Sequence, residues 1–102
     1  MKSLAQVRLQ LSAGEFDFTR HALKRAVERN ISVQEIVQVG ETAEIIEEYP
    51  DDKYSPSCLL LGFTQGARPL HLQISLADTI LVRIVTLYEP SEEEWSNYSK
   101  RR

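Results

Sequence analysis

The second half of the chain contains four segments rich in branched apolar and aromatic residues, separated by clusters of proline, glycine and aspartate. They are Ala43 to Tyr49, Ser57 to Phe63, Pro69 to Ser75 and Ile80 to Tyr88. This pattern predicts four strands joined as consecutive hairpins, and such strands are antiparallel. In the third segment His71 and Gln73 alternate with leucine and isoleucine. Because strand side chains alternate between faces, one face of the sheet is core and the other is polar.

Helical spacing of apolar residues predicts three helices before the strands. Thr19 stands where it can cap the second helix, and Ser32 with Glu35 has the spacing of a capping box at the start of the third. The predicted ranges are Leu4 to Ser12, the Thr19 cap to Arg29, and Ser32 to Gly40. A last helix is predicted to start at Pro90 and Ser91, because Ser91 and Glu94 form a second capping box.

These elements, with a short extended piece at Phe16 to Phe18, predict an α+β fold. We expect N-terminal helices packed on one face of a four-stranded antiparallel sheet, followed by a short C-terminal helix. A length of 102 residues predicts one domain, 1–102.

Composition narrows the classes of function. The net charge of −3 and the pI near 5.4 argue against nucleic-acid binding through bulk charge. No apolar run is long enough to cross a membrane, and no signal peptide is visible, so we expect a cytoplasmic protein without membrane contact. With one cysteine and two distant histidines, we expect no metal site and no cofactor. The cysteine, Cys58, should be buried and unreactive in an apolar strand.

His71 is the main candidate for chemistry, since its strand neighbours are core residues and its imidazole projects onto the polar face. A neutral imidazole suits general acid–base work. The alternative is a half-exposed histidine that hydrogen-bonds across strands. Arg83 interrupts the fourth apolar segment and shares the face of His71 if the register of the last two strands permits it.

Two further sets of residues are candidates for phosphate or base contacts. His21, Arg25 and Arg29 are spaced four apart, so they form one polar stripe on the second helix. Such a stripe can hold phosphates, or it can be an ordinary solvated face. Tyrosines at strand and loop ends can stack on a base, although packing is their commoner role; these are Tyr49, Tyr54 and Tyr88.

Several strings of the sequence together resemble bacterial domain-of-unknown-function family 4258. They are FTRHALKRAVERNIS, GETAEIIEEYPDD, YSPSCLLLGF, RPLHLQIS and IVTLYEPSEEEW, which span roughly Phe18 to Trp95. That family looks like a branch of the RelE/ParE-like toxin superfamily of small α+β proteins. The positions that match its pattern are His21, Arg25, Arg29, Tyr49, Pro50, Asp52, His71, Tyr88 and Pro90.

The resemblance implies a toxin of a type II toxin–antitoxin system that cleaves RNA without a metal. It implies a cognate antitoxin, of the YgiT zinc-finger type, and RNA or the ribosome as target. The catalytic candidates are then His71, Arg83 and Tyr88, and the substrate-binding candidates are His21, Arg25, Arg29, Tyr49 and Tyr54. The acidic pI departs from this picture. The alternative is a non-catalytic protein-interaction module of the same fold.

The strand period also predicts how the candidates are arranged. If helices cover the apolar face, His71 lies on the opposite face, and Arg83 joins it there if the strand register permits. The helix stripe then forms a second, separate cluster. The loop from Tyr49 to Ser57 is expected to close over the same end of the sheet and bring Asp52 near.

Overall fold

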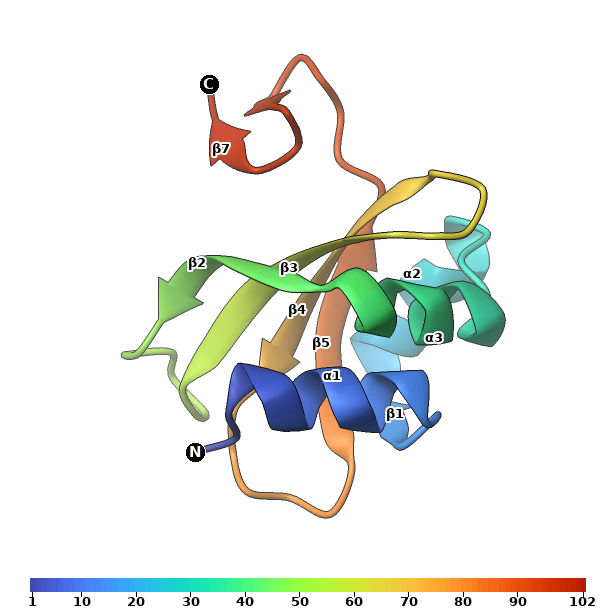
Figure 1. Ribbon diagram of the computed structural model, residues 1–102. Coiled ribbons are helices and arrows are strands. Elements are labelled where there is room, and N and C mark those ends of the chain that lie inside the picture. The colour runs from blue at the N-terminus through green and yellow to red at the C-terminus, as the bar shows by residue number, and fades with distance from the viewer.

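The computed structural model describes residues 1–102 and contains three helices, a five-stranded sheet and a separate two-stranded hairpin (Figure 1). The helices are α1 (Leu4–Ser12), α2 (Arg20–Glu28) and α3 (Val33–Thr42). The strands are β1 (Phe16–Phe18), β2 (Glu44–Tyr49), β3 (Ser57–Phe63), β4 (Pro69–Ser75), β5 (Val82–Tyr88), β6 (Trp95–Ser96) and β7 (Lys100–Arg101).

The main sheet has the order β1-β5-β4-β3-β2, and β1 runs parallel to β5 while the other pairs are antiparallel. The prediction of a four-stranded antiparallel sheet is therefore wrong. The extended piece at Phe16–Phe18 adds a fifth strand, anchored by the bonds from Val82 N–H to Glu15 O (3.1 Å) and from Thr19 N–H to Ile84 O (3.0 Å). Local sequence does not reveal this pair, because its two strands are distant along the chain.

The predicted C-terminal helix is also wrong. Its first turn begins as expected, because the Trp95 N–H donates to the Ser91 carbonyl oxygen at 3.0 Å. Asn97 and Tyr98 then adopt positive φ angles of 51° and 61°, which no right-handed helix contains. The chain reverses there, and Trp95–Ser96 pairs with Lys100–Arg101 as the β6–β7 hairpin.

The N-terminal helices begin where their caps predict. The Thr19 side chain accepts from Ala22 N–H at 3.0 Å, and both bonds of the Ser32–Glu35 capping box are present. Helix α3 continues two residues past its predicted end at Gly40. Gly40 serves a different purpose, because a Cβ there would lie 2.6 Å from the Leu11 Cβ. This glycine lets α1 and α3 approach closely.

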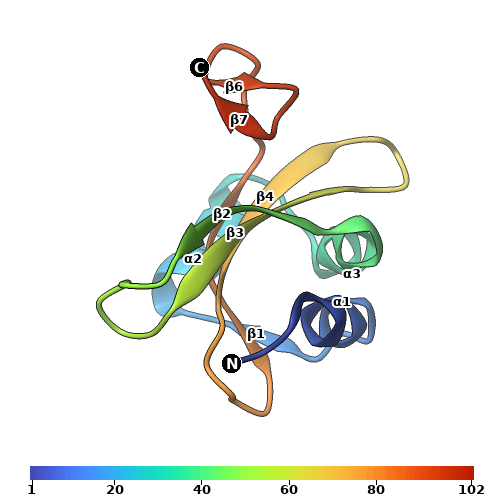
Figure 2. The ribbon, with the colours of Figure 1, turned by 60° about the vertical axis from the view of Figure 1, so that its left-hand side comes forward.

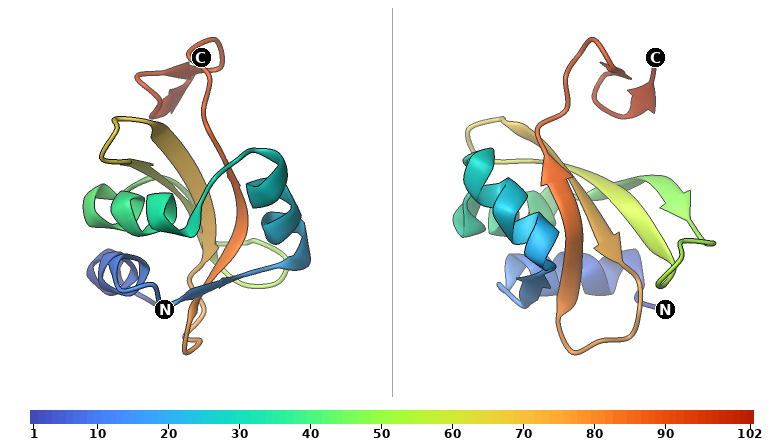
Figure 3. Two further views of the ribbon diagram at one scale, coloured as in Figure 1. Left: turned by 90° about the vertical axis from the view of Figure 1, so that its right-hand side faces the viewer. Right: turned by 180° about the vertical axis from the view of Figure 1, so that it is seen from behind.

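The core lies between the sheet and a layer made by α1 and α3, which run side by side on one face (Figure 2). Buried apolar residues of both layers meet there, among them Leu11, Ile36, Leu60, Leu72 and Ile84. Helix α2 packs beside β5, apart from the α1–α3 layer (Figure 3).

The structure also bears on the predictions for Cys58 and for membrane-spanning segments. Cys58 is fully buried among the apolar residues, which confirms the burial that its strand predicted. None of the helices has both the length and the apolar character needed to span a membrane.

Candidate functional site

The face of the sheet opposite α1 and α3 carries polar side chains. On β4, His71, Gln73 and Ser75 alternate with residues of the core. The register places His71 beside Tyr88, and Gln73 beside Thr86. As predicted from the strand period, His71 thus lies on the face away from the α1–α3 layer. The C-terminal hairpin covers one part of this face, which we call the covered patch, and leaves an open pocket on the other.

His71 is the centre of the covered patch and is fully buried. Its Nε2–H donates to the Tyr98 carbonyl oxygen at 2.5 Å, and the Tyr88 hydroxyl donates to Nδ1 at 3.1 Å. A carbonyl oxygen only accepts, so the proton of the neutral ring must sit on Nε2. The indole ring of Trp95 closes the patch, with ring centroids 4.5 Å apart. Burial lowers the pKa of His71, although its bond to the Tyr98 carbonyl opposes the shift.

An ion pair holds the edge of the covered patch. Arg101 donates from Nε and Nη2 to the two carboxylate oxygens of Glu47, at 2.8 and 3.2 Å. The same guanidinium lies over the Trp95 ring, 4.6 Å from its centroid. Hydrogen bonds from Arg101 lower the pKa of Glu47, and burial together with the bond to Glu47 raises the pKa of Tyr49 to about 12. These groups tie the hairpin to β2.

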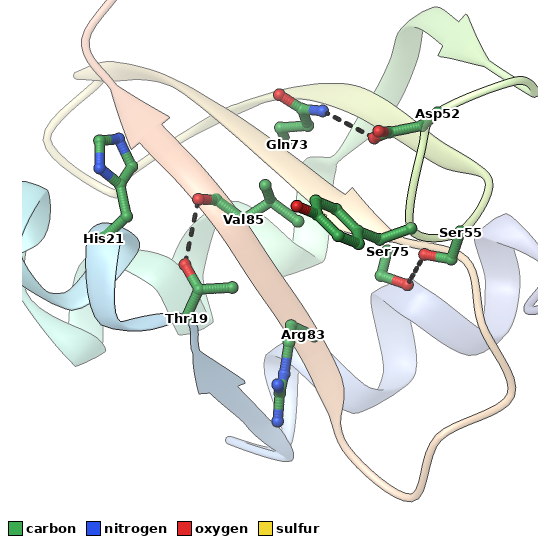
Figure 4. Close-up of a pocket in the computed structure, with 9 residues that line it drawn as sticks. Thr19, His21, Asp52, Ser55, Gln73, Ser75, Arg83 and Val85 are labelled. Carbon is green, nitrogen blue, oxygen red and sulfur yellow. Dashed lines mark hydrogen bonds between the residues drawn. The ribbon is translucent and has the colours of Figure 1, made fainter.

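The open pocket has a volume of about 450 Å³, which lies in the range of small-ligand sites. Figure 4 shows the side chains of His21 on α2, Arg83 and Val85 on β5, and Asp52 and Ser55 in the loop between β2 and β3, with the guanidinium of Arg83 pointing toward β1. The nine lining residues are Thr19, His21, Asp52, Tyr54, Ser55, Gln73, Ser75, Arg83 and Val85.

A hydrogen-bond network fixes the wall of the pocket nearest β3. The Ser57 hydroxyl donates to the Asp52 carboxylate at 2.6 Å, and Gln73 Nε2 donates to the Ser57 oxygen at 3.2 Å. The hydroxyls of Ser55 and Ser75 share a bond of 2.7 Å. The loop between β2 and β3 therefore closes over the sheet, as the sequence predicted.

Arg83 supplies the positive charge of the pocket on β5. Its Nε and Nη2 bind both oxygens of Asp17 on β1, at 3.1 and 2.9 Å, and this pairing raises the pKa of Arg83. Nη1 has no partner in this pair and remains available to an anion. His21 is exposed on the facing helix. The pocket thus offers a guanidinium and an imidazole on one side, and a carboxylate and an amide on the other.

The structure divides the candidates that the sequence suggested. His71 and Tyr88 come together in the covered patch, whereas His21, Arg83 and Tyr54 come together in the open pocket. The expected group of His71 with Arg83 does not form, because Tyr88, the partner of His71 on β5, and Arg83 lie toward opposite ends of that strand.

The remaining candidates lie outside the pocket. Arg25 pairs with Glu28 of the same helix at 2.8 Å, and its side chain is partly exposed. Arg29 donates to the Leu87 carbonyl oxygen at 2.7 Å and fixes α2 against β5. Tyr49 donates to Glu47 at the edge of the covered patch. The helical stripe is therefore split, and only His21 reaches the pocket.

Sequence reasoning missed the part that Trp95 and Arg101 play in covering His71. No local signal identifies it, since the capping box at Ser91 favours a helix. Ser75 was also missed, although the alternation of β4 places it two residues beyond Gln73 on the same face. No three His, Cys, Asp or Glu side chains are grouped so that they could hold a metal ion.

The comparisons with known proteins identify a family. The model of the family described as "Domain of unknown function (DUF4258)" matches residues 18–89. No curated protein and no solved structure matches the chain. The resemblance to RelE/ParE-like toxins is not confirmed by these comparisons. The match covers well over half of the sequence, and the chain belongs to the DUF4258 family.

Proposed function

We propose that the polar sheet face binds single-stranded RNA, and that the chain is a toxin of a toxin–antitoxin pair which cleaves RNA without a metal. One observation carries the proposal: an imidazole–phenol pair and an open polar pocket occupy one continuous face. His71 and Gln73 are neighbours on that face, about 7 Å apart along β4 at the rise of a strand. A nucleotide in the pocket would place its neighbour at His71.

The pocket side chains match the groups of a nucleotide. Arg83 Nη1 and His21 suit a phosphate, because both are donors that can carry positive charge. Tyr54 is 89% exposed and offers a ring on which a base can stack. The carboxylate of Asp52 and the amide of Gln73 can pair with the edge of a base. The pocket therefore binds RNA through specific contacts and does not depend on bulk positive charge, which is consistent with a net charge of −3.

His71 and Tyr88 would perform the chemistry. For this the His71 ring carries its proton on Nδ1, facing the Tyr88 oxygen, and the free Nε2 takes the proton of the 2′-hydroxyl as the 2′-oxygen attacks the adjacent phosphorus. Arg83 lies toward the other end of β5 and would hold the phosphate of the neighbouring nucleotide in the pocket, so that the reacting phosphate is positioned at His71. A protonated group returns a proton to the 5′-oxygen as the P–O bond breaks, and Tyr88 is placed for this beside His71. The products are a 2′,3′-cyclic phosphate and a free 5′-hydroxyl.

Expression of the chain without a partner tests the proposal. We expect growth arrest, and cleavage of RNA by the purified chain in the presence of EDTA. Both should be lost in His71→Gln that retains the wild-type circular dichroism spectrum. Arg8→Gln is the matched control, since it removes an arginine–glutamate pair on the far side of β2. Arrest and cleavage that persist in His71→Gln would remove His71 from the mechanism.

A non-catalytic interaction module is the second candidate. The closed state of His71 favours it, because both ring nitrogens already have partners within the protein. If the chain is such a module, we expect the purified protein at micromolar concentration not to cleave RNA. We also expect it to bind the product of the adjacent gene tightly. For the toxin, that product would be an antitoxin of the YgiT zinc-finger type. Cleavage of RNA that is lost in His71→Gln would reject the module.

A further inference from the structure

We infer that the β6–β7 hairpin is a displaceable cap, which holds His71 closed and opens to join the covered patch with the pocket. The consequence for RNA cleavage rests on the proposed function, whereas the opening itself does not. The hairpin stands at one end of the molecule and projects from the main body in every view (Figures 1, 2 and 3). It forms its own sheet and adds no strand to the main one.

The hairpin has no backbone ladder to the rest of the protein. Its backbone hydrogen bonds are internal, including those from Ser99 N–H to Ser96 O (3.1 Å) and from Arg102 N–H to Glu94 O (3.0 Å). The Tyr98 side chain also bonds within the C-terminal segment, because its hydroxyl donates to Glu92, just before β6, at 2.7 Å. The hairpin can therefore move as a unit without breaking a strand pair.

Only a few contacts hold the hairpin on the sheet. The hydrogen bonds that cross are from His71 to the Tyr98 carbonyl and from Arg101 to Glu47. The rings of Trp95 and Tyr98 rest on His71 and Phe63, with centroids 4.5 and 6.3 Å away. The arginine is largely exposed, and ion pairs of this kind are weak. Most of the attachment thus depends on one indole ring.

The turn of the hairpin presents the carbonyl oxygen that blocks His71. Tyr98 has a φ of 61°, and a bulky side chain rarely occupies this left-handed region. Its carbonyl oxygen is the one that accepts from His71. The conformation belongs to the two-residue turn closed by the Ser99–Ser96 bond, so the turn stays intact when the hairpin moves, and at the turn opening breaks only the bond from Nε2 to this carbonyl. Nε2 is also the ring nitrogen that faces away from Tyr88, so the cap blocks the atom that a substrate would reach.

The two histidines of the chain provide the test. Diethyl pyrocarbonate modifies accessible imidazoles, and mass spectrometry locates the adducts. His21 is exposed and serves as the internal standard, while His71 reports the cap. Trp95→Ala and Arg101→Ala loosen the cap. Arg8→Ala is the control, because it removes a pair with Glu44 of the same strand, β2, away from the hairpin.

We expect slow modification of His71 in the wild type and in Arg8→Ala. The rate should rise about threefold in Arg101→Ala, as fits loss of an exposed ion pair, and more than about tenfold in Trp95→Ala. The rate at His21 should not change. Hydrogen exchange of the hairpin amides should be faster than that of the β4 amides in the wild type.

Equal protection of His71 in all four proteins, each still folded, would overturn the cap. So would hairpin amides that exchange only with global unfolding. No RNA is present in these measurements, so their outcome is independent of the proposed function. If His71 becomes reactive in Arg101→Ala while RNA cleavage does not rise, the cap stands and the ribonuclease proposal fails.

Discussion

The indole ring of Trp95 meets the imidazole of His71 edge to face, with ring centroids 4.5 Å apart and an interplanar angle of 88°. Trp95 comes from the C-terminal hairpin and His71 from the middle of the main sheet. Through this contact the end of the chain covers the one histidine of the polar sheet face. The rest of that face stays open as the pocket.

The cap should weaken as the pH falls. Burial lowers the pKa of His71 from its usual value of 6.5 when the cap is closed and outweighs the opposing effects of the Tyr98 carbonyl and Glu47, while Arg101 lowers it further. An uncovered His71 binds a proton at a higher pH than the covered one, so acid favours the open state below about pH 6.5. Trp95 is the only tryptophan, and its fluorescence reports the contact. We expect a red shift and stronger acrylamide quenching on going from about pH 7.5 to about 5.5.

His71→Gln is the control for this titration, because glutamine keeps polar atoms under the indole but does not titrate. It should show no such change over the same range. Fluorescence that is constant in the wild type, or equal changes in both proteins, would contradict a cap governed by His71.

Gly62→Ala should destabilise the fold. A Cβ at this position of β3 would lie 2.5 Å from Val39 Cγ1 and 2.6 Å from the Val39 carbonyl oxygen, so α3 would have to move off the sheet. We expect the free energy of unfolding in urea to fall by about 2 kcal/mol. Gly66→Ala is the matched control, because a Cβ there would come no closer than 3.8 Å to Thr64 Oγ1, and it should change stability by less than about 0.5 kcal/mol. Equal stability of the two variants would contradict the packing of α3 on β3.

Cys58 should resist thiol reagents in the native state. Burial, together with the charge of Glu48, raises the pKa of its thiol to about 11. We expect labelling at least about a thousandfold slower than in denaturant, because reaction requires global opening. Rapid native labelling would instead show that β3 is not a central strand.

Arg83→Gln should weaken binding of single-stranded RNA more at low salt than at high salt. Removal of one phosphate contact reduces the slope of log affinity against log salt by about one. Fluorescence anisotropy with a labelled oligonucleotide measures this slope. Arg8→Gln should leave the slope unchanged, since Arg8 lies outside the pocket. An unchanged slope in Arg83→Gln would show that Arg83 does not contact a phosphate of the bound RNA.

Local chemistry in the sequence predicts much of the fold. The caps at Thr19 and Ser32 place the starts of α2 and α3, and the alternation of β4 separates His71 and Gln73 from the core. These features depend on a few neighbouring residues, which is why a single sequence reveals them. The burial of Cys58 follows from the same reasoning.

The errors arise where distant segments meet. The pairing of β1 with β5 joins segments that are separated by most of the chain. The register of β5 places Tyr88, and not Arg83, beside His71. The serine–glutamate box at Ser91 does form a turn, but two left-handed residues and the docking of Trp95 override the helix it favours. For the same reason the sequence suggests His71 as an exposed group, whereas tertiary contacts bury it.

The most direct measurement of the central claim is a chemical-shift titration of the ¹⁵N-labelled chain with a short single-stranded RNA that carries 2′-O-methyl groups and cannot be cleaved. If the pocket binds RNA, the side-chain amide of Gln73 and the backbone amides of Arg83 and Tyr54 shift in a saturable manner, while α1 does not respond. No saturable shift, or shifts confined to the outer side of α2 around Arg25, would contradict RNA binding at the polar sheet face.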